Sequence, residues 1–176
     1  MIQLSEKIGA LMQDSLLHGV DFVWIDPSEI ECPYRDLLFH SKDMTSTLAR
    51  FHGSEITLSV LQEAHREGVY VREVLLSAGE KPVEYGLIEV TLGHFDEALR
   101  SVILSGKKPL GGILNESRMG YQSNPSGYFK IKRCAFSPDF FPSRGGEFLF
   151  GRYNTLSDAK GRLLARIVEI LPYENP

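Results

Sequence analysis

The chain has 176 residues, of which 43% are hydrophobic and 24% charged, and this balance predicts one globular domain spanning residues 1–176. The net charge of -4 and the lack of a basic run argue against a nucleic-acid or anionic-membrane partner. No apolar stretch approaches the ~20 residues of a membrane-spanning helix, and the N-terminus, interrupted by Glu6, Lys7 and Asp14, is amphipathic rather than a signal peptide. We therefore expect a cytoplasmic protein.

Cysteine and histidine usage points away from disulfides and metals. Cys32 and Cys134 form no CxxC motif, so we expect free thiols in a reducing compartment. The five histidines are scattered, and no two have the i, i+4 spacing of a helical metal site. The sequence therefore predicts no metal.

Apolar periodicity predicts three helices in the first third of the chain. The first lies within residues 2–16, and a short one follows Pro33 over residues 34–40. The third lies within residues 43–53, with Asp43 or Thr45 as its N-cap and Gly53 at its end.

The apolar pattern then changes from a helical period to a strand period. Alternation predicts strands over residues 55–63, 69–78 and 83–92, whose short connections favour an antiparallel meander. Residues 94–106 read as a helix, and a short helix begins near Pro109. After a loop over residues 118–126, strands are predicted over 127–136, 147–156 and 162–172. The pattern predicts an α+β fold, with a six-stranded antiparallel sheet and helices packed on one side.

Two charged residues fall on apolar strand faces. Arg72 alternates with Tyr70, Val74 and Leu76, and Glu169 alternates with Ile167 and other apolar residues of the last strand. An isolated buried charge is very costly, so each needs a partner or a ligand. A structural interpretation, in which the two form a buried salt bridge or their strand faces are solvated, is as open as a ligand site.

The neighbours of these two residues leave the choice of face open. Glu73 and Arg166 also lie on apolar faces, so the pattern does not choose between Arg72 and Glu73. The segment KKPLGGIL offers a different feature, a helix start with free N–H groups, two glycines and the nearby charges of Lys107 and Lys108. Such a start can bind an anion, but a plain helix N-terminus is the simpler interpretation, because every helix has one.

Five segments occur in an order that resembles the chorismate lyase family. They are LLFHSKDMTSTLARFHGSEITLSVLQE, YVREVLLSAGEKPVEYG, KKPLGGIL, FGRYNTL and ARIVEILP, and they span residues 37–172. Each segment is short and weak alone, but their shared order and spacing are hard to obtain by chance. The resemblance implies a six-stranded antiparallel sheet with helical flaps over a buried pocket.

The resemblance also implies roles for single residues. It places the arginine that binds the product carboxylate at Arg72, which selects this residue over Glu73, and the glutamate near the phenolic hydroxyl at Glu169. Backbone N–H groups at Met44 and Leu110 would meet the same carboxylate, with Gly111 beside them as a further substrate-binding position. One departure concerns the family's second arginine, at the site entrance, because the matching position here is Leu87; Arg118 or Arg152 is a candidate replacement.

The implied function is a carbon–oxygen lyase that converts chorismate to a hydroxybenzoate, with 4-hydroxybenzoate expected, and pyruvate. Arg72 would fix the ring carboxylate and Glu169 would act as a general acid at the ether oxygen, with no cofactor. The expected partner is a small aromatic or cyclohexadienyl carboxylate.

Two alternatives stay open. One is a lyase-fold enzyme that makes the 3-hydroxy isomer or acts on another carboxylated ring. The other is a non-catalytic aromatic-acid binding module, as in the ligand-binding domains of some bacterial transcription regulators. Those normally follow a winged-helix domain of roughly 60 or more residues, and the residues before Leu37 include no basic recognition helix.

Overall fold

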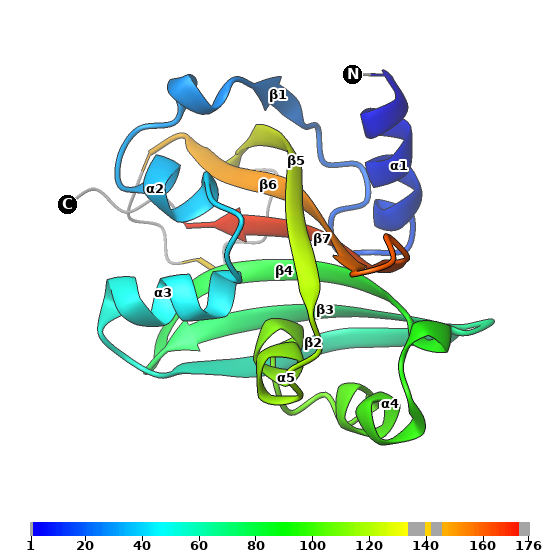
Figure 1. The fold of residues 1–176 in the computed structure, drawn as a ribbon. Helices are drawn as coiled ribbons and strands as arrows, with labels where there is room; N and C mark the ends of the chain where they lie inside the picture. The colour runs from blue at the N-terminus through cyan, green and yellow to red at the C-terminus, as the bar shows by residue number, and fades with distance from the viewer. Residues whose placement is uncertain (1, 134–139, 142–145, 173–176) are drawn as a thin grey trace.

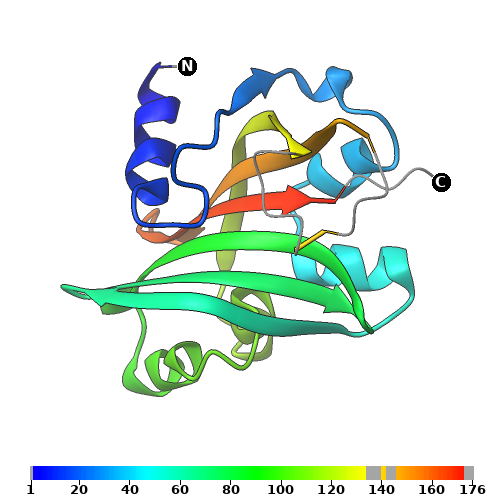
Figure 2. The same ribbon diagram turned by 180° about the vertical axis from the view of Figure 1, so that it is seen from behind.

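A seven-stranded antiparallel sheet organises the computed structural model, which describes residues 2–133, 140–141 and 146–172. The strand order is β1-β5-β6-β7-β4-β3-β2, and every neighbouring pair is antiparallel (Figures 1 and 2). The strands are β1 (Val23–Ile25), β2 (Ile56–Arg66), β3 (Val69–Ala78), β4 (Lys81–Thr91), β5 (Tyr121–Lys132), β6 (Phe148–Asp158) and β7 (Leu163–Leu171).

Five α-helices and two short 3-10 turns connect these strands in the described part of the chain. The helices are α1 (Ile2–Met12), α2 (Tyr34–Leu38), α3 (Met44–His52), α4 (Glu97–Leu104) and α5 (Leu110–Glu116), and the turns are η1 (Pro27–Glu29) and η2 (Leu92–His94). Asp43 caps α3 by accepting a hydrogen bond from the Ser46 N–H at 2.8 Å, and Gly53 ends it at a φ of 61°. Both ends therefore follow ordinary capping chemistry. None of the described helices is long and apolar enough to span a bilayer.

The α+β class and the antiparallel sheet are confirmed, and each of the six predicted strands is present. The seventh, β1, was missed because it has only three residues. β5 begins at Tyr121, inside the predicted loop over residues 118–126, and a bulge between Pro125 and Gly127 accommodates the proline. The end predicted for this strand at residues 134–136, with Cys134, lies outside the described residues, whereas Cys32 is a free, exposed thiol.

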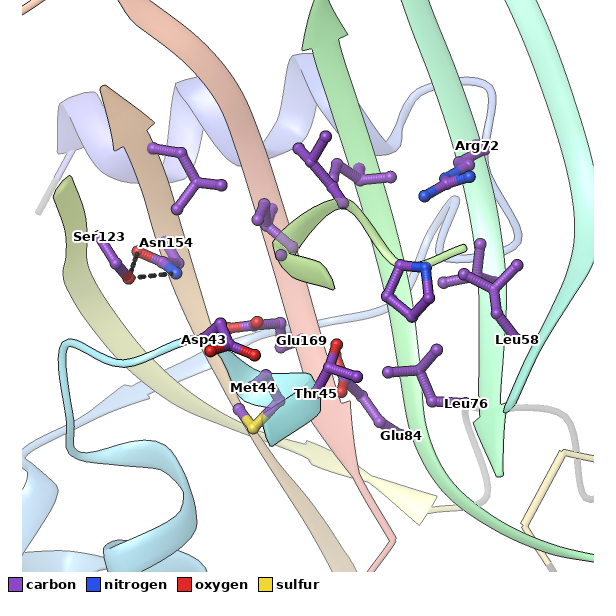
Figure 3. A pocket seen from close by; sticks show the side chains of 18 of the residues that line it. Asp43, Met44, Thr45, Leu58, Arg72, Leu76, Glu84, Ser123, Asn154 and Glu169 are labelled. Carbon is purple, nitrogen blue, oxygen red and sulfur yellow. Dashed lines mark hydrogen bonds between the residues drawn. The ribbon is translucent and has the colours of Figure 1, made fainter. Parts of the chain in front are cut away.

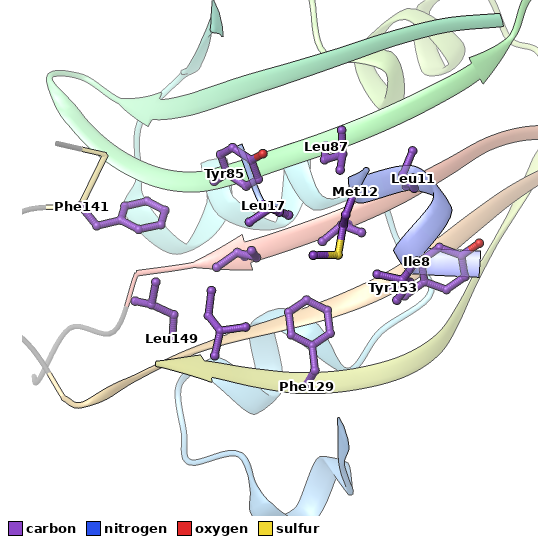
Figure 4. Packing of buried hydrophobic residues seen from close by; sticks show 13 residues of the cluster. Ile8, Leu11, Met12, Leu17, Tyr85, Leu87, Phe129, Phe141, Leu149 and Tyr153 are labelled. Atoms are coloured by element: carbon purple, nitrogen blue, oxygen red, sulfur yellow. The ribbon is translucent and has the colours of Figure 1, made fainter. Parts of the chain in front are cut away.

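The two faces of the sheet are covered differently. Figures 1 and 2 show α3 and α5 on one face of the sheet. Apolar side chains of α2, α3, α4 and α5 pack on this face, as the prediction of helices on one side implies. Helix α1 lies on the opposite face of the sheet from the other helices. Its residues Ile8, Leu11 and Met12 pack there against Tyr85, Phe129 and their neighbours (Figure 4). Leu87 belongs to this second face and is fully buried there.

The core on the side of α2–α5 is divided into two clusters. One gathers α2, α3 and the ends of β3 and β7, with Leu38, Leu48 and Leu76 among its buried residues. The other gathers α4, α5 and the opposite ends of the strands, with Ile103 and Leu114 among its buried residues. Between them the sheet carries charged side chains, and this gap is where the candidate site lies.

Close packing of strands β5, β6 and β7 predicts a strong effect of Gly151→Ala. A Cβ at this position would lie 2.5 Å from the Glu169 carbonyl oxygen and 2.5 Å from Cζ of the Phe129 ring. Because backbone and a buried ring cannot both yield cheaply, we expect a loss of about 1–3 kcal/mol in the free energy of unfolding, measured in urea. Gly93→Ala is the control, since a Cβ there meets nothing within 4 Å; equal effects in the two variants would refute the packing argument.

Candidate functional site

A pocket opens between the two clusters, with the sheet as its floor and the starts of α3 and α5 at its side (Figure 3). The space between its walls is about 580 Å³, a value that includes volume open to solvent. Its walls are mainly apolar and include Met44, Leu58, Val74, Leu76, Ile88, Leu110, Leu156 and Ile167. Its charged lining side chains are Asp43, Arg72, Glu84 and Glu169.

Strand register explains how residues distant in sequence meet on this floor. Arg72, Ile88, Ile167 and Asn154 are successive cross-strand partners, so they form one row over β3, β4, β7 and β6. The next row contains Val74, Gly86, Glu169 and Arg152 in the same strand order. Because cross-strand partners point to the same face, both rows project toward the pocket side of the sheet.

Arg72 is the basic residue of the pocket lining. Its residue surface is 1% exposed, and one Nη2–H donates to the Lys108 carbonyl oxygen at 2.9 Å. Its Nε and Nη1 have no hydrogen-bond partner among the described residues, and the guanidinium carbon lies 5.9 Å from the centre of the Tyr70 ring. Burial lowers the pKa of Arg72, as expected for a cation in an apolar setting. Two buried donor nitrogens are therefore available to an anion.

Glu73, the alternative that the sequence pattern left open, points to the other face. Its carboxylate accepts hydrogen bonds from the Leu16 N–H at 3.0 and 3.1 Å, and from the side chains of Gln62 and Tyr85. It therefore has a complete set of donors and fastens the segment after α1 to the sheet. The choice of Arg72 as the residue facing a ligand agrees with this geometry.

Glu169 lines the pocket, but its partner is Arg152 rather than Arg72. Nε of Arg152 donates to Oε2 of Glu169, and Nη1 donates to the carbonyl oxygens of Leu38 and His40, both at 2.9 Å. Arg152 is 0% exposed, and Glu169 is 4% exposed. The salt bridge between Arg72 and Glu169, one of the two interpretations of the pattern, is thus wrong. Arg152 does not replace an entrance arginine either, because it is a buried structural cation.

Glu84 is a site residue that the sequence analysis missed. It is 4% exposed, and its Oε2 has no hydrogen-bond partner among the described residues. Burial, reinforced by the negative charge of Glu169, holds the pKa of Glu84 well above its ordinary value of 4.5, while Arg152 opposes this shift. The available signal was its alternation with Gly86 and Ile88 in β4, but its place near a predicted turn suggested solvent exposure.

The two helix starts lie where the resemblance places them. Met44 and Leu110 are the first residues of α3 and α5, and both line the pocket together with Gly111. The first N–H groups of a helix have no intrahelical acceptor, so these backbone donors are suited to an anion. Gly111 is closely packed, because a Cβ on it would lie 3.0 Å from the Asp43 Cβ and Asp43 would have to shift.

Other basic side chains do not line this pocket. The Lys108 ammonium pairs with the Glu116 carboxylate at 2.7 Å on the surface, and Lys107 and Arg118 are exposed. Leu87, the position matched to the family's second arginine, lies on the opposite face of the sheet. The pocket-facing position beside Arg72 is Ile88, which is also apolar. No second cation of the described lining is thus available for a second carboxylate.

A neutral polar corner lies apart from the charged groups. The Asn154 amide donates to the Ser123 hydroxyl at 3.0 Å, and both side chains line the pocket (Figure 3). Within the described ranges, no group of three His, Cys, Asp or Glu residues is arranged to hold a metal ion. The polar groups that the described pocket offers to a ligand therefore include one buried guanidinium, three carboxyl groups, backbone N–H donors and one amide–hydroxyl pair.

The buried ion pair predicts that Arg152→Met is strongly destabilising. Removing this cation leaves Glu169 buried without its partner and two carbonyl groups without a donor. We expect a loss of about 3–5 kcal/mol in the free energy of unfolding, measured in urea. The double variant Arg152→Met, Glu169→Gln removes both charges and should regain part of the loss; no recovery would show that the ion pair is not the cause.

The raised pKa of Glu84 predicts a pH-dependent gain from Glu84→Gln. The folded protein retains this proton above pH 4.5, where the unfolded chain loses it, so the contribution to stability is full below that pH and falls as the pH rises toward the folded-state pKa. Gln does not titrate, so its advantage over the wild type should grow by about 1.4 kcal/mol per pH unit in that window. Urea unfolding at pH 5 and 7 checks this, with Glu80→Gln on the exposed β3–β4 turn as control. Parallel pH curves for wild type and Glu84→Gln would contradict it.

A scan against protein-family models and a search of curated proteins each found no match for this chain. Solved structures do match. PhnF from Mycobacterium smegmatis aligns with a TM-score of 0.58 and 9% identity, over 76% of this chain and 65% of that chain. The effector domain of the same protein aligns with a TM-score of 0.56 and 9% identity, over 74% of this chain and 88% of that one.

Two further structures show the same arrangement. The gene product SA0254 from Staphylococcus aureus aligns with a TM-score of 0.56 and 10% identity, over 79% of this chain and 96% of that chain. The ligand-binding domain of a putative GntR-family transcriptional regulator from Bordetella bronchiseptica aligns with a TM-score of 0.50 and 14% identity, over 69% of this chain and 91% of that chain. At these identities the likeness concerns the fold, and that fold is the chorismate lyase-like α+β arrangement.

Proposed function

We propose that this chain is a binding module for a small ring carboxylate, held in the pocket between α3, α5 and the sheet. The observation that carries the proposal is Arg72, a buried guanidinium at the pocket whose Nε and Nη1 have no hydrogen-bond partner among the described residues. A buried cation of this kind is costly unless an anion neutralises it. A carboxylate matches the planar guanidinium, because its two oxygens can accept from Nε–H or Nη1–H together with the remaining Nη2–H.

The rest of the pocket supports an apolar ligand body. Aliphatic side chains such as Val74, Ile88 and Leu156 form the walls, and Gly86 leaves the floor open because it has no side chain. Backbone N–H groups at Met44 and Leu110 lie at the helix starts on the pocket wall and would complete the carboxylate site. Such a pocket, apolar with a few placed polar groups, is typical of small-molecule sites.

The structural neighbours favour binding over catalysis. One of them is described as an effector domain and another as the ligand-binding domain of a regulator, and each aligns over 88% or more of its own length. From those proteins we infer that this chain binds a ligand, but we do not infer which ligand. Where such a module is coupled to a transcription regulator, DNA would be an indirect partner, contacted by other parts of the regulator.

Conversion of chorismate to a hydroxybenzoate and pyruvate is the second candidate. It is favoured by Arg72 and Glu169 lining one pocket, as the resemblance implies. Two observations weigh against it. Chorismate carries two carboxylates, and the described lining offers one cation. Moreover, Oε2 of Glu169 already accepts a hydrogen bond from Nε of Arg152, so it is not free to act on a leaving oxygen.

Loss of the Arg72 charge should abolish most of the binding. We expect Arg72→Met to weaken the affinity for 4-ethylbenzoate, used as the probe, by roughly 10- to 150-fold, which corresponds to hydrogen bonds with a charged group. Isothermal titration calorimetry measures this, and a near-UV circular dichroism spectrum like that of the wild type confirms folding. The matched control is Arg66→Met, because Arg66 is exposed and pairs with Asp14. Equal binding by Arg72→Met and the wild type would refute the carboxylate site.

A single assay separates the two candidate functions. The protein is incubated with chorismate, and pyruvate and hydroxybenzoate are measured against the uncatalysed background. A binding module should release no pyruvate above that background. Release that Arg72→Met suppresses and Arg66→Met retains would instead establish the lyase.

A further inference from the structure

The acidic side of the pocket has an excess carboxyl group. Glu169 has Arg152 as its ion-pair partner, whereas Glu84 has no cation of its own. The charge of Arg152 acts on Glu84 as well as on Glu169, so one positive charge serves two carboxyl groups. One negative charge is therefore uncompensated whenever both are ionised.

This acidic side is separated from Arg72 across the sheet. Glu84 pairs with Leu76, which follows Arg72 by four residues in β3, a distance of roughly 13 Å along the strand. Glu169 lies two strands away from β3, in the row next to that of Arg72. Figure 3 shows Glu84 and Glu169 grouped together and apart from Arg72. The pocket thus has a basic end and an acidic end with apolar walls between them.

We propose that the ligand is zwitterionic, with its carboxylate on Arg72 and an ammonium group on Glu84 and Glu169. This inference rests on the proposed function and adds the chemical class of the ligand. The ammonium would supply the cation that Glu84 lacks, and its three N–H donors would satisfy the unpartnered oxygen. The lining favours this charge pattern, because three carboxyl side chains and one guanidinium line the described pocket.

Binding of an ammonium group has a consequence for protons. Burial and the charge of Glu169 raise the pKa of Glu84 and favour its protonated form, so an arriving ammonium would displace that proton to the solvent and leave an ion pair. A ligand hydroxyl would leave the proton in place. The charged and titratable groups that face Glu84 and its partners are Glu169 on β7, Arg152 on β6, Tyr128 on β5, Arg72 on β3, and Asp43 and His40 before α3.

Two matched probes test the inference on the full chain. In 4-(aminomethyl)benzoate and 4-ethylbenzoate, an ammonium replaces a methyl group at equal size. We expect calorimetry to give the amine an affinity at least about tenfold higher at pH 7, since a buried charge-assisted contact is worth that much or more. Titration in buffers of different ionisation enthalpy should show a proton released with the amine and none with 4-ethylbenzoate.

Substitution of Glu84 provides the second arm. Glu84→Gln should lose most of the preference for the amine over 4-ethylbenzoate, together with the proton release. Glu80→Gln should retain both. The inference is overturned if the wild type binds the amine no more tightly than 4-ethylbenzoate, or if Glu84→Gln keeps the preference for the amine. In either case, binding of 4-ethylbenzoate by the wild type still supports the proposed function. If neither probe binds, the proposed function fails and the inference fails with it.

Discussion

Four buried charged side chains at the centre of one sheet face are the constraint on which this structure depends. Arg72, Glu84, Arg152 and Glu169 are each at most 4% exposed, although burying a charge is among the costliest events in folding. The fold compensates only part of this cost, through the Arg152–Glu169 pair and the carbonyl groups around Arg152. Two nitrogens of Arg72 and one oxygen of Glu84 have no hydrogen-bond partner among the described residues, and both side chains line the pocket. The apolar core on this side is therefore split into two clusters, and a mainly apolar pocket that carries these charged groups lies between them.

Strand alternation marked Arg72 and Glu169 as charges on apolar strand faces, but it did not separate Arg72 from Glu73, and the resemblance made that choice. Alternation failed for Glu84, which lies three residues after the start of β4 and beside an irregularity between Leu76 and Ser77, where a position near a turn looks exposed. The partner of Glu169 was also out of reach of the pattern. β6 and β7 pair in a register that brings Arg152 opposite Glu169, and no spacing in the sequence encodes that register. The sheet itself was predicted well, except where β1 is short and β5 is rich in polar residues and proline.

Leu87 illustrates how a family resemblance fails at single-residue resolution. Successive side chains of a strand point to opposite faces, so an offset of one residue exchanges the pocket for the core under α1. The pocket-facing residue opposite Arg72 is Ile88, and Leu87 packs against α1. With either alignment, the strand has no second arginine, because both Leu87 and Ile88 are apolar. The consequence for the described pocket is that it has one arginine, and not two, to neutralise ligand carboxylates.

Catalysis by this pocket would depend on which carboxyl group can deliver a proton to the reacting atom. A general acid must hold a proton and deliver it to the reacting atom. Oε2 of Glu169 already accepts a hydrogen bond from Arg152, whereas burial and the charge of Glu169 raise the pKa of Glu84 and favour its protonated form. If this pocket did protonate a leaving group, Glu84 would be the donor, and the role that the resemblance assigns to Glu169 would become that of an electrostatic support. The same arrangement makes Glu84 a proton-linked contact for a cation, which uses the uncompensated carboxyl group without requiring any bond to break.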